Sequence, residues 1–300
     1  MPWPFRRRAA RFRVPLSRRV AELEIVSSRL IRAGFAGDYH SAFHGRGIEF
    51  AQVREYLPGD DIRTIDWNVT ARSGVPHVKE FIEERDLTIM VALDVSGSMA
   101  FGSIDWRKID IGAELAAVFA FSAVQNSDRV GLMLFSKTIR KFISPRRGNA
   151  HAQVLVRAAV AAAMQGCSGD ADLTNAVNYL DRVSAKRAVV IVISDFLDLD
   201  FEHALRRLNR RHDVVALGIT DPREERFPDR GLVRLVDIES GERRLIDVPR
   251  SDVARRAQLR AAQLERRFRA SSIDHLFVST AAPYDRELLR FFRERTVRRR

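Results

Sequence analysis

The sequence predicts an α/β fold with a doubly wound, mostly parallel sheet. Short runs that are apolar almost throughout, at residues 87–93 and 188–193, are typical of strands that helices cover on both faces. A longer segment at residues 108–126 carries apolar residues at helical spacing and lies between these two runs. Strands that alternate with helices along a chain favour a parallel sheet with helices on both of its faces.

The same patterns define the other elements of this sheet domain, which we expect to span residues 85–300. Further β-type runs predict strands at residues 129–135, 138–143, 214–219 and 274–279, and a hairpin at residues 232–238 and 243–248. Segments with helical periodicity predict helices at residues 151–164, 173–183, 201–211, 252–269 and 286–295.

Two smaller regions precede the sheet domain. Residues 1–33 are expected to form a basic, poorly ordered N-terminal segment to about residue 20 and a helix after it, because apolar residues recur at helical spacing from Val20 onward. Residues 34–84 are rich in Gly, Asp and Arg and contain two strand-like pieces, at 49–53 and 77–82. We expect this second region to be a small β-rich subdomain that packs beside the sheet domain.

Composition restricts the class of protein. The 300 residues are 46% hydrophobic and 30% charged, which is typical of a globular chain with enough apolar material for a core. A single cysteine excludes an internal disulfide framework and favours a reducing compartment, so a cytoplasmic location is expected. No apolar stretch reaches the roughly 20 residues that a membrane-spanning helix needs.

The net charge of +12 is concentrated at the two ends of the chain. A basic end of this kind favours acidic partners or the anionic inner face of a membrane, and a peripheral membrane location is therefore an alternative. Binding to nucleic acid is not expected, because no base-stacking aromatic pattern accompanies the charge. The arginines in question are Arg6, Arg7, Arg8, Arg11, Arg13, Arg18 and Arg19 at the start, and Arg293, Arg295, Arg298, Arg299 and Arg300 at the end.

A candidate metal motif follows the first apolar run. Asp94, Ser96 and Ser98 lie at alternate positions where the predicted strand ends. Ligand sites of open α/β sheets lie at this end of the strands. One carboxylate and two hydroxyls suit a hard divalent cation, Mg²⁺ or alternatively Mn²⁺ or Ca²⁺, and offer nothing to a soft metal. The alternative is an ordinary strand–helix turn whose hydroxyls cap the next helix.

These residues resemble the start of the metal-ion-dependent adhesion site of von Willebrand factor A (vWA) domains, whose fold is Rossmann-like. The stretch before them, FAQVREYLPGDDIRTIDW from Phe50 to Trp67 and then Thr70-Ala71-Arg72, resembles the signature of the DUF58 family. The resemblance implies a vWA-like domain behind this block. It also implies a partner of MoxR-type AAA+ ATPases that acts in the assembly or maturation of other proteins.

By the same resemblance, two further loops complete the metal site. Asp195 follows the apolar run at residues 188–193 and matches the carboxylate of the last loop. In the middle loop the usual threonine ligand aligns with Ala171, which has no side-chain oxygen. Asp172 or Asp170 replaces this ligand, a water fills the gap, or the site binds metal weakly; the sequence leaves these outcomes open.

The DUF58 block itself has two interpretations. Its ionic residues either form a buried network that ties the subdomain to the sheet domain, since Arg forks onto carboxylates, or they belong to a partner-binding face that exposes Trp67 and Arg72. The sequence does not decide between them. The residues concerned are Arg54, Asp60, Asp61, Arg63, Asp66, Trp67 and Arg72.

The function we expect is that of a non-enzymatic protein-interaction module. It works with a MoxR-type AAA+ ATPase, and it binds an acidic side chain of a partner through the divalent cation. The alternatives are a metal-dependent hydrolase that uses Asp94 and Asp195, and a basic scaffold at the membrane surface. No Walker sequence, dinucleotide fingerprint or nucleophile elbow is present, and no small-molecule substrate is expected.

Overall fold

A computed structural model describes residues 15–43, 48–83, 87–197, 201–225, 232–236, 243–247 and 252–298. Its centre is a six-stranded sheet made of β3 (Thr88–Asp94), β4 (Arg129–Phe135), β5 (Ile139–Arg146), β6 (Val189–Ser194), β7 (Asp213–Thr220) and β10 (Asp274–Ser279). The strand order is β10-β7-β6-β3-β4-β5, and only the edge strand β5 runs antiparallel to its neighbour. The predicted fold class, a mostly parallel α/β sheet, is confirmed.

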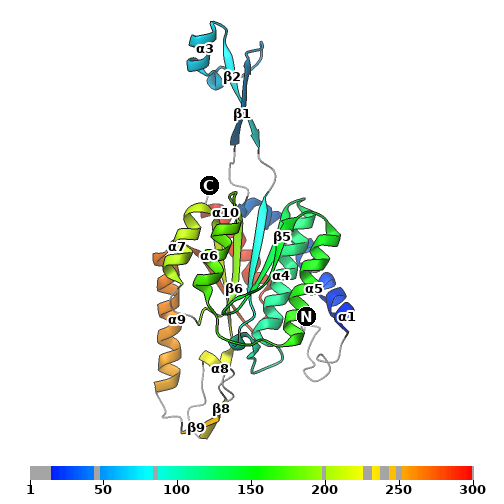
Figure 1. Ribbon diagram of the computed structural model, residues 1–300, viewed down its shortest axis with the longest axis vertical. Helices are drawn as coiled ribbons and strands as arrows, with labels where there is room; N and C mark the ends of the chain where they lie inside the picture. Colours follow the sequence, from blue (N-terminus) through cyan, green and yellow to red (C-terminus); the bar gives the residue numbers. More distant parts are fainter. Residues whose placement is uncertain are drawn as a thin grey trace.

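Helices cover both faces of this sheet (Figure 1). One face carries α1 (Leu16–Leu30), a π-helical turn η2 (Ile31–Phe35), α2 (Ala36–Phe43), α4 (Lys108–Gln125), α5 (Asn149–Gln165) and α10 (Asp285–Arg298). The other face carries α6 (Leu173–Val183), α7 (Glu202–Arg211) and α9 (Asp252–Ala270). The smaller elements are η4 (Gly97–Ala100), α8 (Pro222–Glu225) and the hairpin of β8 (Leu232–Val236) and β9 (Arg243–Asp247).

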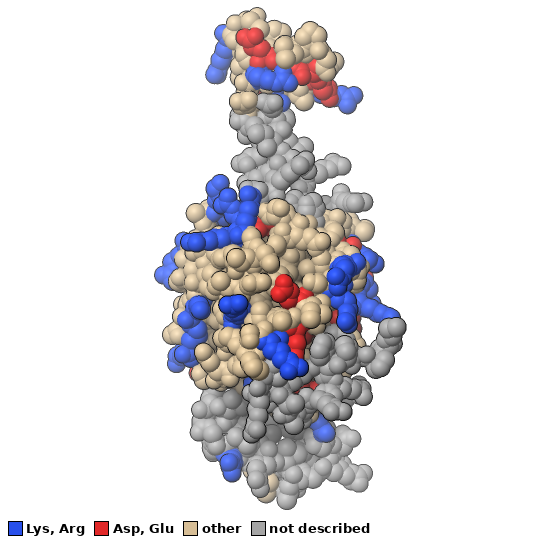
Figure 2. All heavy atoms as spheres, turned by 90° about the vertical axis from the view of Figure 1, so that its right-hand side faces the viewer, with Lys and Arg blue, Asp and Glu red and all other residues tan. Residues whose placement is uncertain are grey.

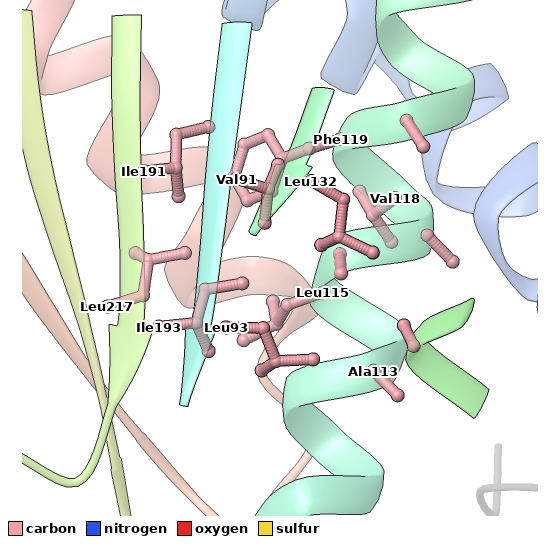
Figure 3. Packing of buried hydrophobic residues seen from close by; sticks show 14 of the residues in the cluster. Val91, Leu93, Ala113, Leu115, Val118, Phe119, Leu132, Ile191, Ile193 and Leu217 are labelled. Carbon is pink, nitrogen blue, oxygen red and sulfur yellow. The ribbon is translucent and has the colours of Figure 1, made fainter. Parts of the chain in front are cut away.

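Alternating side chains of the buried strands feed two separate apolar cores. Val91 and Leu93 of β3 pack toward α4, where Leu115 and Phe119 meet them (Figure 3). Ala92 belongs to the core on the opposite face. This alternation follows from the two-residue period of a strand, and each fully buried side chain of this size contributes about 1.5–3 kcal/mol.

Helix α4 is the central helix of its face. It is buried over nearly its whole length, from Lys108 to Ala123, because the sheet lies on one side of it and α1 and α5 pack on the other. A helix that is apolar all round is expected in such a position. Its first residue, Lys108, is therefore enclosed although it is charged.

At the amino ends of the strands, Arg295 of α10 bridges the neighbouring strands β7 and β10. Its guanidinium group donates to Asp213 at the start of β7 and, over 2.7 Å, to Asp274 at the start of β10. The ring of Phe43 lies 4.4 Å from the guanidinium carbon. Arg295 is fully buried, so it does not belong to the basic end that was expected to attract acidic partners or a membrane: this arginine fastens the last helix to the sheet.

The boundaries predicted for the first two regions need correction. Helix α1 already begins at Leu16, so residues 16–20 are helical and do not belong to the poorly ordered N-terminal segment. Residues 1–14 lie outside the described part. Residues 36–43 form α2, whose Tyr39 and Phe43 pack against Phe292 of α10. These residues belong to the sheet domain because their aromatic side chains are part of its core.

The remainder of the second region is a projecting hairpin, here called the arm and defined as residues 48–83. Strands β1 (Ile48–Glu55) and β2 (His77–Glu83) pair antiparallel, and η3 (Ile62–Thr64) and α3 (Trp67–Ser73) lie between them. The expected strands are confirmed. The expected packing beside the sheet domain is wrong, because the tip of the arm extends away from the sheet (Figure 1). No described helix is long and apolar enough to cross a membrane.

Candidate functional site

Three neighbouring strands of the sheet end in carboxylates. Asp94 is the last residue of β3, Asp195 follows β6 directly, and Asp221 follows β7 directly. These strands are adjacent and parallel, so their carboxyl ends meet at one edge of the sheet. We call this edge the polar rim and define it by Asp94, Ser96, Ser98, Lys108, Ser194, Asp195, Asp221 and Glu224.

Asp94 is completely buried and accepts hydrogen bonds from the loop that follows it and from the end of β6. Its Oδ1 accepts from the backbone N–H of Ser96 at 2.8 Å, and its Oδ2 accepts from the hydroxyl of Ser194 at 2.7 Å. Burial, and then the charge of Asp195, raise the pKa of Asp94 to about 6 against these hydrogen bonds. The structure thus brings the two predicted aspartates close enough to repel each other.

Asp195 is paired with a buried lysine. Its Oδ2 lies 2.6 Å from the Nζ of Lys108, and the same Nζ lies 2.5 Å from Oε1 of Glu224 in α8. The side chains of Lys108 and Asp195 are almost completely inaccessible to solvent. Neither Lys108 nor Glu224 was among the predicted site residues.

The two serines of the candidate metal motif lie side by side in the first loop. Their hydroxyl oxygens are 3.2 Å apart; Ser96 is buried and Ser98 is half-buried. The backbone N–H of Gly97 donates to the carbonyl of Gly169 at 2.8 Å, which joins this loop to the middle loop of the predicted site. Asp94, Ser96, Ser98 and Asp195 are therefore positioned at one edge of the sheet.

The middle loop supplies no evident replacement for the missing threonine. Asp172 is the N-cap of α6, and its Oδ1 accepts from the backbone N–H of Asn175 at 2.7 Å. Asp170 is exposed on the same loop. That Asp172 supplies the ligand missing at Ala171 stays a prediction.

The donor set of the rim fits an ammonium group better than a divalent ion. Asp195 already shares its Oδ2 with Lys108, and Ala171 has no oxygen to offer. A second cation beside Asp195 would have to displace the lysine or share a carboxylate with it.

Asp221 was missed although the sequence contains a signal for it. It is fully buried and accepts hydrogen bonds from the hydroxyls of Ser103 and, at 2.7 Å, Thr280. Burial alone would raise the pKa of Asp221, but these hydrogen bonds outweigh it and the pKa is lowered. Its position after an apolar strand is the pattern that marked Asp94 and Asp195, and this pattern would have found it.

In the arm, the aspartates serve the local structure. Asp60 accepts a bidentate pair from Arg54 at 2.7 and 2.8 Å, and this bonding lowers its pKa to about 2. Asp61 accepts from the backbone N–H of Arg63 at the start of η3. Asp66 caps α3 and lies 3.5 Å from the Nζ of Lys79. The network holds the turns of the arm together.

The apolar side chains at the tip of the arm point to solvent. Trp67 is 69% exposed, Ile62 67% and Leu57 61%, and Arg63 and Arg72 are exposed beside them. Acidic and basic side chains both lie at the surface of the tip (Figure 2). The interpretation of the block as a buried network to the sheet domain is therefore wrong, because its ion pairs lie within the arm and Trp67 and Arg72 are both exposed.

The comparisons with known proteins identify the family. The profile of the family described as "Protein of unknown function DUF58" matches residues 52–269, so the chain belongs to the DUF58 family. The uncharacterized protein Mb1516 of Mycobacterium bovis is 32% identical over 279 residues, covering 91% of this chain and 87% of that protein. The uncharacterized protein MAV169 of Mycobacterium avium is 29% identical over 157 residues, covering 51% of this chain and 93% of that protein.

Solved structures give distant matches. BatB, a conserved hypothetical protein from Bacteroides thetaiotaomicron, matches at 12% identity with a TM-score of 0.44, covering 70% of this chain and 99% of that one. The SpRpn10 VWA domain matches at 15% identity with a TM-score of 0.36, covering 68% of this chain and 93% of that one.

Proposed function

We propose that this protein is a non-enzymatic interaction module that works with a MoxR-type AAA+ ATPase in the assembly or maturation of other proteins. Membership of the DUF58 family and an α/β fold of the kind expected for a vWA-like domain support a role in protein interaction. The ATPase partnership comes from the resemblance of the DUF58 block. We further propose that the protein acts in the cytoplasm.

The exposed tip of the arm is the observation that carries this proposal. Trp67, Ile62 and Leu57 are each more than 60% exposed on a hairpin that extends away from the sheet. Large apolar side chains gathered on a projecting element are typical of interaction sites, and Trp and Arg are enriched at binding hot spots.

The tip presents charges of both signs. Asp60 is occupied by Arg54, and Asp66 by the start of α3 and by Lys79, while Glu55 and Asp61 are exposed. Arg63 and Arg72 are exposed as well. A partner segment that combines apolar side chains with charges of both signs would complement this surface.

A metal-bridged contact at the polar rim is the alternative to a contact through the arm. In it, Mg²⁺ held by Asp94, Ser96, Ser98 and Asp195 binds an acidic side chain of the partner. This contact requires the ion to displace the Lys108 ammonium group from Asp195, because the two would otherwise meet at the same carboxylate. It is therefore tested separately from the arm.

The two alternative functions have less support. A metal-dependent hydrolase would use Asp94 and Asp195, but both carboxylates already bind groups of the protein, including Lys108. A membrane scaffold would use the basic ends, but Arg295 is buried in ion pairs with Asp213 and Asp274.

The test is binding of the full-length chain to a MoxR-type ATPase of the same genome, measured by biolayer interferometry. We expect Trp67→Ala to weaken binding at least about tenfold, as for a hot-spot residue. The matched control is Ile25→Ala, which removes an equally apolar side chain, 58% exposed, from α1 of the sheet domain. We expect this variant to bind like the wild type.

Two results would count against the proposal. Failure of the wild-type chain to bind the ATPase would remove the partnership, and equal binding by the Trp67→Ala variant would remove the arm as the contact. Each measurement is repeated with EDTA and with Asp94→Ala. Binding that is unchanged in both would remove the metal-bridged contact and leave the arm.

A further inference from the structure

Lys108 is an unusual residue for its position. It begins α4, and its side chain extends to the ends of the strands instead of into solvent, with an exposed fraction of 0%. Lysine is almost never fully buried unless it is paired. Among the described residues, Lys108 is the one lysine in this state.

The ammonium group of Lys108 connects two carboxylates from separate elements. It donates to Oδ2 of Asp195, at the end of β6, and to Oε1 of Glu224, in α8. Two carboxylates within hydrogen-bond distance of the Nζ favour the charged form of a buried lysine. The lysine therefore keeps its positive charge inside the rim.

We propose that the Lys108 ammonium group is the resident cation of the polar rim and occupies the carboxylate of Asp195 through which a divalent ion would otherwise bind. Two observations beyond the ion pair support this. Ala171 removes one ligand of the predicted metal site, and Asp172 on the same loop caps α6. Because Lys108 neutralises Asp195, the loss of the ligand at position 171 does not leave this carboxylate without a cation.

The proposal has a physical consequence for metal binding. A divalent ion in contact with Asp195 would lie within a few ångströms of the ammonium group, and like charges at such a distance repel strongly in a buried site. Lys108 therefore weakens the affinity of the rim for Mg²⁺ and Mn²⁺. Removing its charge should create a divalent-ion site that the wild-type chain lacks.

The first experiment measures binding of Mn²⁺ and Mg²⁺ by isothermal titration calorimetry. We expect the wild-type chain to show no saturable binding up to millimolar concentrations. The Lys108→Met variant should bind one ion with an affinity at least about tenfold higher, because one unit of positive charge beside Asp195 has been removed. Lys186→Met, at an exposed lysine, is the control and should behave like the wild type.

A second substitution sharpens this experiment. Ala171→Thr restores a hydroxyl to the middle loop of the rim. With Lys108 present, we expect this change to leave metal binding undetectable. Combined with Lys108→Met, it should raise the affinity beyond that of the single variant. If Ala171→Thr alone produced tight binding, the missing hydroxyl would be the limiting factor and the proposal would be wrong.

A measurement on the wild-type chain covers the case in which Lys108→Met does not fold. Lysine reactivity is followed by reductive methylation and mass spectrometry, with and without millimolar Mg²⁺. Lys108 should stay unmodified in both conditions, while the exposed Lys137, Lys141 and Lys186 react and serve as internal standards. Mg²⁺-dependent modification of Lys108 would mean that the ion displaces it.

The proposal would be overturned by tight, stoichiometric Mg²⁺ binding to the wild-type chain that is lost in Asp94→Ala. It would equally be overturned by a folded Lys108→Met variant that binds Mn²⁺ no better than the wild type. Neither outcome depends on the partner protein. The proposed contact through the arm can therefore stand while this proposal fails, and the reverse, whereas the metal-bridged alternative requires the Mg²⁺ binding that would overturn it.

Discussion

Among the described residues, each end of the sheet buries one lysine or arginine side chain. Lys108 lies at the carboxyl ends of the strands and Arg295 at their amino ends, and both are completely inaccessible to solvent. Each binds two carboxylates from different elements: Asp195 and Glu224 for the lysine, Asp213 and Asp274 for the arginine. Burial and number of partners are therefore the same, and the surroundings differ.

The surroundings indicate that Arg295 has a structural role and that Lys108 lies at an edge that can bind a ligand. At the amino end, Arg295 also stacks on Phe43, and Arg298 lies 3.6 Å from Asp274, so that two cations face two carboxylates. At the carboxyl end, one lysine faces two carboxylates while a third, Asp94, lies next to Asp195 and has a raised pKa. Lys108 thus faces more carboxylates than it binds, at the edge where parallel sheets bind ligands.

The largest effect on stability is expected for Arg295→Met. Its removal leaves Asp213 and Asp274 without their buried partner, which typically destabilises a protein by about 3–5 kcal/mol. Urea unfolding with and without Mg²⁺ measures this. The loss of unfolding free energy should be the same in both conditions, because the amino end is not a metal site. If Mg²⁺ restored the stability of Arg295→Met, the distinction between the two ends of the sheet would be wrong. Arg290→Met, at an arginine 70% exposed, is the control.

A smaller, pH-dependent effect is expected for Asp94→Asn. The pKa of Asp94 is about 6 in the folded chain against the usual 3.8, and this gap corresponds to about 3 kcal/mol. The favourable protonation of the folded state is complete below pH 3.8 and is lost as the pH rises through 6. The free energy of unfolding of Asp94→Asn, relative to wild type, should therefore increase between these pH values.

The measurement is urea unfolding of both proteins across this pH range. Asp221→Asn is the matched comparison, because the pKa of Asp221 is lowered and the sign is opposite: its stabilising contribution is lost as the pH falls. Parallel pH profiles for wild type and Asp94→Asn would show that the pKa of Asp94 is not raised in the folded chain.

Thr280→Val tests the carboxylate of Asp221 at the end of β7 and should lower the stability modestly. The Thr280 hydroxyl donates to the buried carboxylate of Asp221, and loss of one such hydrogen bond costs about 1–3 kcal/mol. The free energy of unfolding at neutral pH measures it. Thr296→Val, which removes a hydroxyl bonded to a backbone carbonyl within α10, is the control and should cost less. A larger loss of unfolding free energy for Thr296→Val than for Thr280→Val would contradict the conclusion that Thr280 stabilises the buried carboxylate of Asp221.

The smallest effect on stability is expected for Trp67→Ala. Because the side chain is 69% exposed, the free energy of unfolding should change by no more than about 0.5 kcal/mol. Thermal unfolding checks this. A large loss would show that Trp67 packs against the rest of the protein, and the arm would then be a structural element and not a contact surface.

The elements of the sheet domain could be predicted closely from the sequence. The strand at residues 129–135 and the helix at 173–183 have the predicted bounds, because apolar spacing alone distinguishes a strand covered on both faces from an amphipathic helix. Asp94 and Asp195 were also predictable as neighbours, since each follows a buried strand and adjacent parallel strands end at one edge.

The position of the arm could not be predicted in the same way. Its strands follow from their composition, but no local pattern determines whether a hairpin packs on the sheet or extends from it. The dense Arg and Asp residues suggested burial. In the structure, Asp60, Asp61 and Asp66 are used for turns and caps within the arm, which needs no contact with the sheet.

Lys108 was missed for a different reason. Helical periodicity records the apolar positions of α4, and a lysine in the first turn of a helix normally points to solvent. Only the tertiary arrangement, in which α4 is buried on all sides and α8 places Glu224 beside Asp195, turns this residue inward. Contacts between elements more than 80 residues apart in the chain have no local sequence signal.

The rim itself can be examined in crystals of the wild-type chain and of Lys108→Met that have been soaked in Mn²⁺. Anomalous scattering would locate a bound ion without reference to any partner. We expect no anomalous peak at the rim of the wild-type chain, with Lys108 still bound to Asp195, and a peak between Asp94 and Asp195 in the variant. A peak in the wild-type rim, with the Lys108 ammonium group moved away from Asp195, would contradict its role as the resident cation.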